Sequence, residues 1–145
     1  MTAPCLFCQI ARRDVTAHVV HDDERLLAFL CICPIRPGHT LIIPKQHFPY
    51  FDDAPADIVA SIAALGQRLA TTMKRLYRVE RVAFFFTGGD IPHTHAHLVP
   101  MHAKTDVTSR RYIVEETLTF RDVARAPDQE LARVAQDLIA GTRMA

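Results

Sequence analysis

The chain has 145 residues, of which 49% are hydrophobic, with 17 basic and 16 acidic side chains and a formal net charge of +1. This length suits one domain with a sizeable core. The balanced charge leaves no electrostatic footprint for nucleic acid or a membrane surface, and the apolar runs are too short for a transmembrane helix. With no signal-peptide pattern, we expect a cytoplasmic protein with a single domain over 1–145, whose core lies at about 5–102 and whose C-terminal extension covers 103–145.

The four cysteines favour thiols or metal ligands over disulfides in an apparently cytosolic chain. Two of them form a Cys-x-x-Cys motif, Cys5 and Cys8, and two thiolates at this spacing can share one tetrahedral zinc ion. A redox pair or two buried thiols would have the same spacing, so these alternatives stay open. Zinc would need two further ligands from elsewhere in the chain. A short helix is expected just after the motif, over Gln9–Asp14.

Three strands and one long helix are predicted next. The strands are expected at His18–Asp22, Leu26–Ile32 and His39–Pro44, and a loop with two prolines and a glycine separates the last two. The helix is predicted to begin at Asp53 as its N-cap. Apolar residues at helical spacing mark its length, and we interpret them as core: Ile58, Ile62, Leu65, Leu69, Met73 and Leu76.

A row of alternating histidines is the most informative feature of the chain. The β-branched and aromatic run Val82–Thr87 predicts a strand, 88–90 predict a turn, and 93–100 predict a second strand that completes an antiparallel hairpin. Side chains alternate along a strand, so His93, His95 and His97 would share one face. Histidine serves as base, nucleophile or metal ligand near neutral pH, and three on one face predict a functional site. We expect the isolated His18, His21 and His102 to be half-buried structural residues.

The end of the chain gives weaker signals. Ala103–Arg110 is polar and predicts a loop, Tyr112–Val114 is consistent with a short strand, and Leu118–Ala126 gives no clear prediction. A final helix is expected from Pro127 or Asp128, with an apolar face formed by Leu131, Val134, Leu138 and Ile139. The order of elements predicts an α+β fold with an antiparallel sheet and helices on one side.

The run from Ile91 to Pro100 fits the His-x-His-x-His signature, followed by apolar positions, of the histidine-triad (HIT) family, which the chain resembles. Cys5-x-x-Cys8, Leu27–Phe29 and Pro34–His47 are also similar to bacterial members, so the resemblance covers roughly residues 5–100. It implies a five-stranded antiparallel sheet with a long central helix and a C-terminal helix on one side. It also implies a homodimer formed through joined sheets.

The resemblance implies a nucleotide hydrolase or transferase that acts at the α-phosphate of a nucleoside phosphoramidate or dinucleotide polyphosphate. By position, His95 would be the nucleophile that forms a nucleotidyl-histidine intermediate, and His97 would hydrogen-bond the phosphoryl oxygens. His39 matches another active-site histidine. Further substrate contacts fall on Phe29, Cys31, Thr87, Gly88 and Gly89. The alternative is a nucleotide-binding module with little turnover.

In zinc-containing relatives of this family, the ligands correspond to Cys5, Cys8, His47 and His93. The resemblance therefore implies a closed structural zinc site with four protein ligands, outside the substrate pocket. Two core thiols without metal remain the alternative.

Several positions depart from the family pattern. Cys31 stands where members usually carry an acidic residue that accepts hydrogen bonds from the ribose hydroxyls, and a thiol is a poor acceptor. Cys33 replaces a usual polar residue, and we interpret both cysteines as small buried hydrophobes. The turn at 88–90 lacks a usual glutamine, which Thr87 or backbone amides could replace. His102 follows the triad where many relatives have arginine. The catalytic histidines therefore match the family pattern, whereas several nucleotide-binding positions do not.

Overall fold

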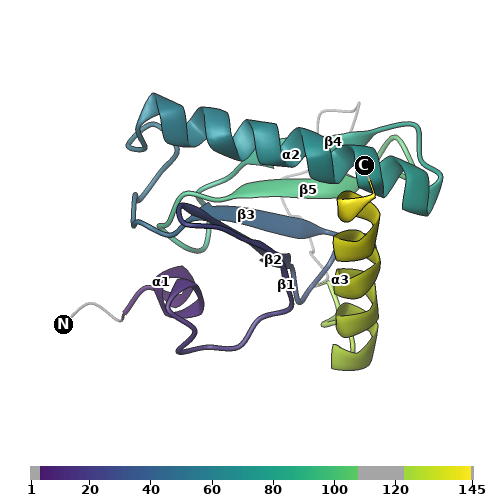
Figure 1. The fold of residues 1–145 in the computed structure, drawn as a ribbon, viewed down its shortest axis with the longest axis horizontal. Helices are drawn as coiled ribbons and strands as arrows, with labels where there is room; N and C mark the ends of the chain where they lie inside the picture. Colours follow the sequence, from purple (N-terminus) through teal and green to yellow (C-terminus); the bar gives the residue numbers. More distant parts are fainter. Residues whose placement is uncertain (1–3, 108–122, 145) are drawn as a thin grey trace, which may run out of the picture.

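The computed structural model describes residues 4–107 and 123–144. The strand expected at Tyr112–Val114 lies outside these residues. The elements in chain order are α1 (Leu6–Ala11), β1 (Val19–Asp22), β2 (Leu26–Leu30), β3 (Thr40–Pro44), α2 (Ala56–Tyr77), β4 (Val82–Phe86), β5 (Ala96–Pro100) and α3 (Asp128–Arg143). Figure 1 shows the sheet with α2 along one side, α1 on the other and α3 across the end of α2. The predicted α+β class is confirmed.

The five strands form one antiparallel sheet in the order β1-β2-β3-β5-β4. The pairings align one residue of each strand in a row across the sheet: Val19, Phe29, Leu41, His97 and Phe85. The predicted antiparallel pairing of the strand at 82–87 with the histidine strand is confirmed. The row places His97 on an interior strand, two strands away from β2.

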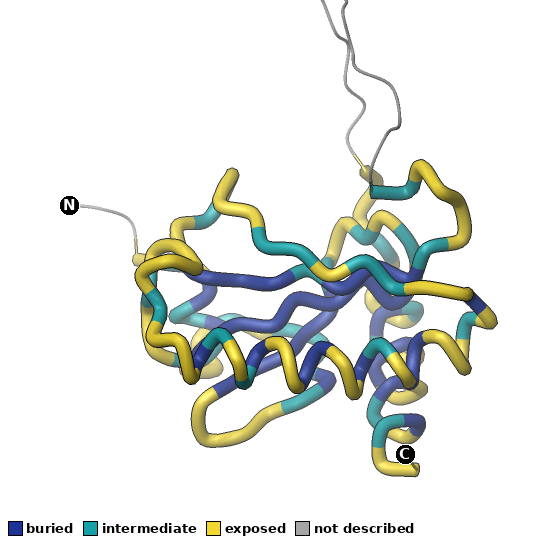
Figure 2. Tube along the Cα trace, turned by 90° about the horizontal axis from the view of Figure 1, so that it is seen from above, coloured by how far each residue is buried: buried dark blue, intermediate teal, exposed yellow. Residues whose placement is uncertain are grey.

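Alternation of side chains gives the sheet two apolar faces. On one face, Ala28, Ile42 and Leu98 belong to a core cluster shared with α2 and α3. On the opposite face, Phe29 and Leu41 belong to a second cluster with side chains of α1. In Figure 2 the buried residues follow the strands and one stripe of α2. His97 is paired with Leu41 and alternates with Leu98, so it lies on the α1 face, which is therefore the face on which the site is built.

The helix α2 buries the predicted apolar stripe through Ile58, Ile62, Leu65, Leu69 and Met73, whereas Leu76 at its end is 39% exposed. Its partner α3 contributes to the same core cluster through the predicted Leu131, Val134 and Leu138 and through Ala135. Because α2 and α3 share one cluster, the prediction that the long helices lie on one side is confirmed. In the described part of the chain, no helix combines the length and apolarity needed to cross a bilayer.

Two predicted boundaries are wrong for a local reason. The N-cap of α2 is Pro55 and not Asp53, because the Asp53 carboxylate accepts the Tyr50 N–H at 3.1 Å and closes a turn before the helix. The strand predicted over 93–100 begins only at Ala96. Before it, the N–H of Thr94 donates to the carbonyl of Phe48 at 2.7 Å, in place of a sheet partner. The first helix, α1, also lies three residues before its expected position.

Candidate functional site

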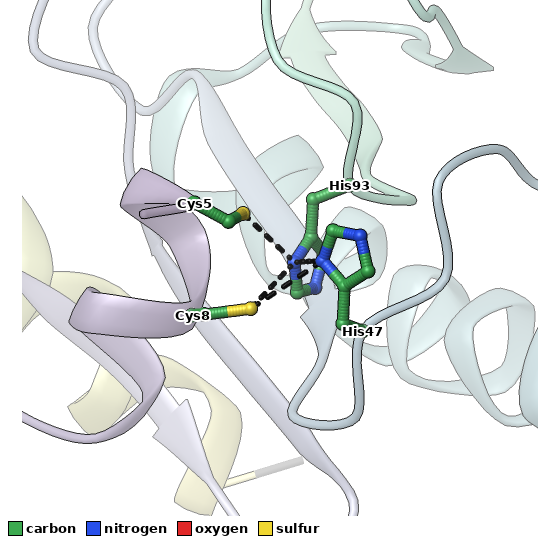
Figure 3. Close-up of side chains that lie close together, drawn as sticks. All are labelled: Cys5, Cys8, His47 and His93. Atoms are coloured by element: carbon green, nitrogen blue, oxygen red, sulfur yellow. Dashed lines mark hydrogen bonds between the residues drawn. The ribbon is translucent and has the colours of Figure 1, made fainter. Parts of the chain in front are cut away.

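Four potential metal ligands converge from three segments of the chain: Cys5 and Cys8 at α1, His47 after β3, and His93 before β5 (Figure 3). Their ligand atoms all lie within 4.8 Å of one another. The Nδ1 atom of His93 is 3.4 Å from Cys5 Sγ, 3.5 Å from Cys8 Sγ and 3.2 Å from His47 Nδ1. A tetrahedral zinc site with ordinary Zn–S and Zn–N bonds has ligand–ligand separations of about 3.3–3.8 Å. The four residues therefore fit zinc in both chemistry and spacing.

The orientation of His93 also suits a metal ligand. Its Nε2–H donates to the carbonyl oxygen of Pro44 at 2.9 Å, which leaves Nδ1 without a proton and directed at the two thiols. Burial lowers the pKa of His93, so the ring is neutral as ligation requires. Burial, and then the neighbouring Cys5, raises the pKa of Cys8. A cation between the thiols would offset that penalty by stabilising the thiolates.

A chain of hydrogen bonds connects the other histidines. The backbone N–H of Ile35 donates to His39 Nδ1 at 3.2 Å, so the ring proton of His39 is on Nε2. This Nε2–H donates to His97 Nδ1 at 2.9 Å, which places the His97 proton on its own Nε2. That Nε2–H donates to Thr87 Oγ1 at 3.0 Å. The hydroxyl of Thr87 then has its own proton to donate to His95 Nε2, 3.4 Å away.

The far end of this chain is determined by a backbone acceptor. His95 Nδ1 lies 2.6 Å from the carbonyl oxygen of His93, which can only accept, so the proton of His95 is on Nδ1. The Nε2 lone pair of His95 is then free of a ring proton. Backbone groups at both ends thus determine one tautomer for each ring. The arrangement places an imidazole lone pair at His95 beside an N–H donor at His97, a pair that could attack a phosphorus atom and stabilise the charge on its oxygens.

Burial keeps two of these rings neutral. Burial, with a smaller contribution from His97, lowers the pKa of His39 to about 4. Burial, with a smaller contribution from His95, likewise lowers the pKa of His97 to about 4. Both rings are therefore uncharged at pH 7, and the hydrogen-bond directions given above hold at that pH.

Because His39 and His97 are buried in the neutral form, we expect the free energy of unfolding to decrease in weak acid. The folded-state pKa of His39 and His97 lies below the unfolded value of about 6.5, so the unfolded chain binds more protons between pH 6.5 and 4. Stability is therefore lost as the pH falls through that window, by about 2 kcal/mol for each histidine between pH 6.5 and 5. Urea unfolding at a series of pH values measures it. The double variant His39→Gln, His97→Gln should have the flatter profile, and parallel profiles would contradict the prediction.

A cavity of about 940 Å³ opens beside His95 and His97. His95 and His97 both line it, although His95 is only 6% exposed. Apolar side chains of α1 and of the sheet form its wall, among them Phe7, whose ring meets that of His95 edge-on at a centroid distance of 5.2 Å. A cavity of this size accommodates a nucleotide-sized ligand.

The structure brings most of the predicted substrate residues to this cavity. Phe29, Cys31, Thr87 and Gly89 line it. Gly88 does not: a side chain there would lie 2.9 Å from the ring of Tyr50, so this glycine instead allows the turn to approach that ring. His39 also lies outside the lining and reaches the cavity through its hydrogen bond to His97.

Cysteines 31 and 33 have different environments. Burial raises the pKa of Cys31, and its thiol donates to the carbonyl of Cys33 at 3.5 Å, so it contributes no anionic acceptor to the cavity. Cys33 is exposed, and its interpretation as a buried hydrophobe is wrong because the loop after β2 turns it outward. His18 and His21 are half-buried as expected, but His102 is exposed in the loop after β5.

Several residues of the cavity wall were not predicted from the sequence, among them Phe7, His18, Arg125 and Asp128. Phe7 lies inside the Cys-x-x-Cys motif, which drew attention only to its cysteines. His18 and Asp128 are 110 residues apart, and their side chains meet only because α3 packs beside β1. Residues 3–4 apart on a helix or 2 apart on a strand leave a sequence signal, and contacts over this separation leave none in a single sequence.

Comparisons with known proteins identify the family of this chain. A family model described as "HIT domain" matches residues 12–104. An uncharacterised HIT-like protein of Methanocaldococcus jannaschii is 33% identical over 102 residues, covering 68% of this chain and 79% of that protein. The adenosine 5′-monophosphoramidase of Saccharomyces cerevisiae is 32% identical over 101 residues, covering 69% of this chain and 64% of that enzyme.

A solved structure is similar over almost the whole fold. It is the crystal structure of a Zn-bound histidine triad family protein from Mycobacterium smegmatis, with a TM-score of 0.74 and 32% sequence identity. The similarity covers 97% of this chain and 94% of that chain. The family match contains the segments that carry His39, His95 and His97.

Proposed function

This chain belongs to the HIT domain family, and from that premise we propose that it hydrolyses or transfers the nucleotidyl group of a nucleotide conjugate through an intermediate on His95. The substrate would be a nucleoside phosphoramidate or a dinucleotide polyphosphate. The single observation that carries the proposal is the hydrogen bond from His95 Nδ1 to the carbonyl of His93, which leaves Nε2 as a nucleophile at the cavity. Relatives named as an adenosine 5′-monophosphoramidase and an adenylylsulfatase support this chemistry.

The proposed reaction has two steps at the α-phosphorus. In the first, His95 Nε2 forms a bond to phosphorus while the bond to the leaving group breaks, and the leaving group departs with the electron pair and takes a proton from solvent. The positive charge that develops on the imidazole is stabilised by the His93 carbonyl. In the second, water attacks phosphorus, the P–N bond breaks, and the water proton passes to solvent. The Nε2–H of His97, which donates to Thr87 Oγ1 in the free protein, would donate to the phosphoryl oxygens in both steps.

We also propose that zinc binds Cys5, Cys8, His47 and His93 as a structural ion. Four protein ligands close the site, so the metal would take no part in the chemistry. Its contribution would be to connect α1 to the segment before β5. His93 would then have two roles, since its ring ligates zinc and its carbonyl orients His95.

The edge of the sheet supports a homodimer. Among the described strands β4 lies at the edge of the sheet, and its sequence Val-Ala-Phe-Phe-Phe contains neither charge nor proline, the usual protections of an edge. Phe84 on this strand is 40% exposed. We expect two chains to pair through β4, so light scattering at micromolar concentration should give twice the 16.3 kDa chain mass. A monomer under those conditions would count against this arrangement.

The lack of an anionic acceptor at Cys31 favours a second candidate function, a nucleotide-binding module with little turnover. Two measurements on one ligand panel separate the functions. Thermal-shift measurements with nucleoside monophosphates report binding, and release of amine from nucleoside phosphoramidates reports turnover. Binding with turnover supports the enzyme, binding alone supports the module, and the absence of binding overturns both.

A further inference from the structure

Three polar side chains form a cluster at the β1 side of the cavity: His18, Arg125 and Asp128. His18 Nε2 lies 3.3 Å and Arg125 Nη2 lies 2.9 Å from the same carboxylate oxygen of Asp128, Oδ1. Within the described residues, the second carboxylate oxygen of Asp128, Oδ2, accepts no hydrogen bond. The Nε–H of Arg125 likewise donates none. A carboxylate held by one oxygen and open at the other is an oriented acceptor, and a guanidinium donor lies beside it.

The sheet register gives the position of this cluster relative to the histidines. His97, Leu41, Phe29 and Val19 lie in one row across four adjacent strands, and His18 immediately precedes Val19. Three strand spacings separate His97 from β1, or about 14 Å. Leu41 and Phe29 lie between them and line the cavity. A nucleotide with its phosphate at His97 would therefore extend over these two side chains toward the cluster.

This placement selects the part of a nucleotide that the cluster can contact. The ribose hydroxyls lie close to the phosphate, whereas the outer edge of the base is the most distant part of a nucleoside monophosphate. Resting on the function proposed above, we infer that Asp128 and Arg125 bind the outer edge of the base and make the site select guanine over adenine. A single-ring pyrimidine would reach less far along the cavity.

We infer guanine because its donors and acceptor match those of Asp128 and Arg125. Guanine presents two adjacent donors, N1–H and the N2 amino group, next to the acceptor O6, which matches a carboxylate oxygen next to a guanidinium. Adenine presents one donor and a ring nitrogen lone pair, which would face the carboxylate unfavourably. The hydrogen bond from His18, followed by that from Arg125, lowers the pKa of Asp128, so the acceptor is ionised at neutral pH.

The experiment compares dissociation constants for GMP, IMP and AMP by calorimetry in wild type and in Asp128→Asn. Wild type should bind GMP about tenfold more tightly than AMP, a moderate factor because the Asp128 side chain is 70% exposed. IMP, which lacks the N2 amino group, should fall between them. In Asp128→Asn the preference for GMP should fall to about twofold or less.

The control is Asp137→Asn, which removes another exposed carboxylate of α3 that pairs with Arg133 and does not line the cavity. Its GMP-to-AMP ratio should equal that of wild type. Equal binding of GMP and AMP by wild type, or an unchanged ratio in Asp128→Asn, overturns base selection by this cluster but leaves the proposed function standing. The absence of binding by all three nucleotides overturns the proposed function and this inference together.

Discussion

His95→Ala is expected to reduce the turnover of a nucleoside phosphoramidate by at least about 10⁴-fold, because the variant has no atom that can form the bond to phosphorus. The His93 carbonyl and His97 would remain in place, but they only orient the nucleophile and stabilise charge. Nucleotide binding should change far less, because the apolar wall of the cavity is unaltered. Amine release under single-turnover conditions measures the chemical step, and calorimetry with GMP measures binding.

The matched control is His21→Ala, which removes a histidine that hydrogen-bonds Asp23 and does not line the cavity. Its turnover should equal that of wild type. A direct test of the intermediate uses wild type quenched in base, because the P–N bond of a phosphoramidate is labile in acid. Mass spectrometry should then find one nucleotidyl group on the peptide that contains His95. Undiminished turnover in His95→Ala would eliminate the covalent mechanism.

The second large effect is expected from loss of the metal. Freshly purified protein should contain about one zinc per chain, and a chelator or Cys8→Ser should lower the melting temperature by at least about 10 °C. The reason is that the four ligands come from three segments, so their joint ligation would stabilise the folded chain and not the unfolded one. Turnover should fall with the metal, since His93 both belongs to the cluster and orients His95.

Cys33→Ser is the control for the metal, because Cys33 is exposed and lies outside the four-residue cluster. Its zinc content and melting temperature should match those of wild type. Elemental analysis and calorimetry measure the two quantities. A zinc content near zero in wild type would remove the structural metal from the proposal, while the nucleophile at His95 would remain to be tested on its own.

Periodicity along the chain predicted which elements form. Apolar residues every three to four positions identified α2 and α3. A β-branched and aromatic run identified β4, the alternating histidines identified β5, and turn and loop signals bounded the first three strands. These signals are local, since a helix or strand buries one side and repeats its apolar residues accordingly. Where a boundary depended on one side chain, as Asp53 closing a turn, or on a distant carbonyl, as Phe48 accepting from Thr94, the prediction missed by two or three residues.

The alternating histidines also show the difference between what local spacing predicts and what tertiary contacts decide. The family resemblance named the cluster at Cys5, Cys8, His47 and His93, and the fold brings these four together. The spacing suggested one extended strand, but only His97 lies in β5. The three rings therefore have separate surroundings: His93 faces the thiols, His95 faces Phe7, and His97 faces His39.

Local pattern was thus sufficient for the fold class and for singling out the histidine row as a candidate site. The proton position on each ring required the folded chain, because it follows from backbone groups at Ile35 and His93 that spacing does not reveal. The polar end of the cavity also required it, because Asp128 meets His18 only when α3 packs beside β1. Helical and strand repeats leave a record in neighbouring residues, whereas contacts between distant segments arise from packing alone.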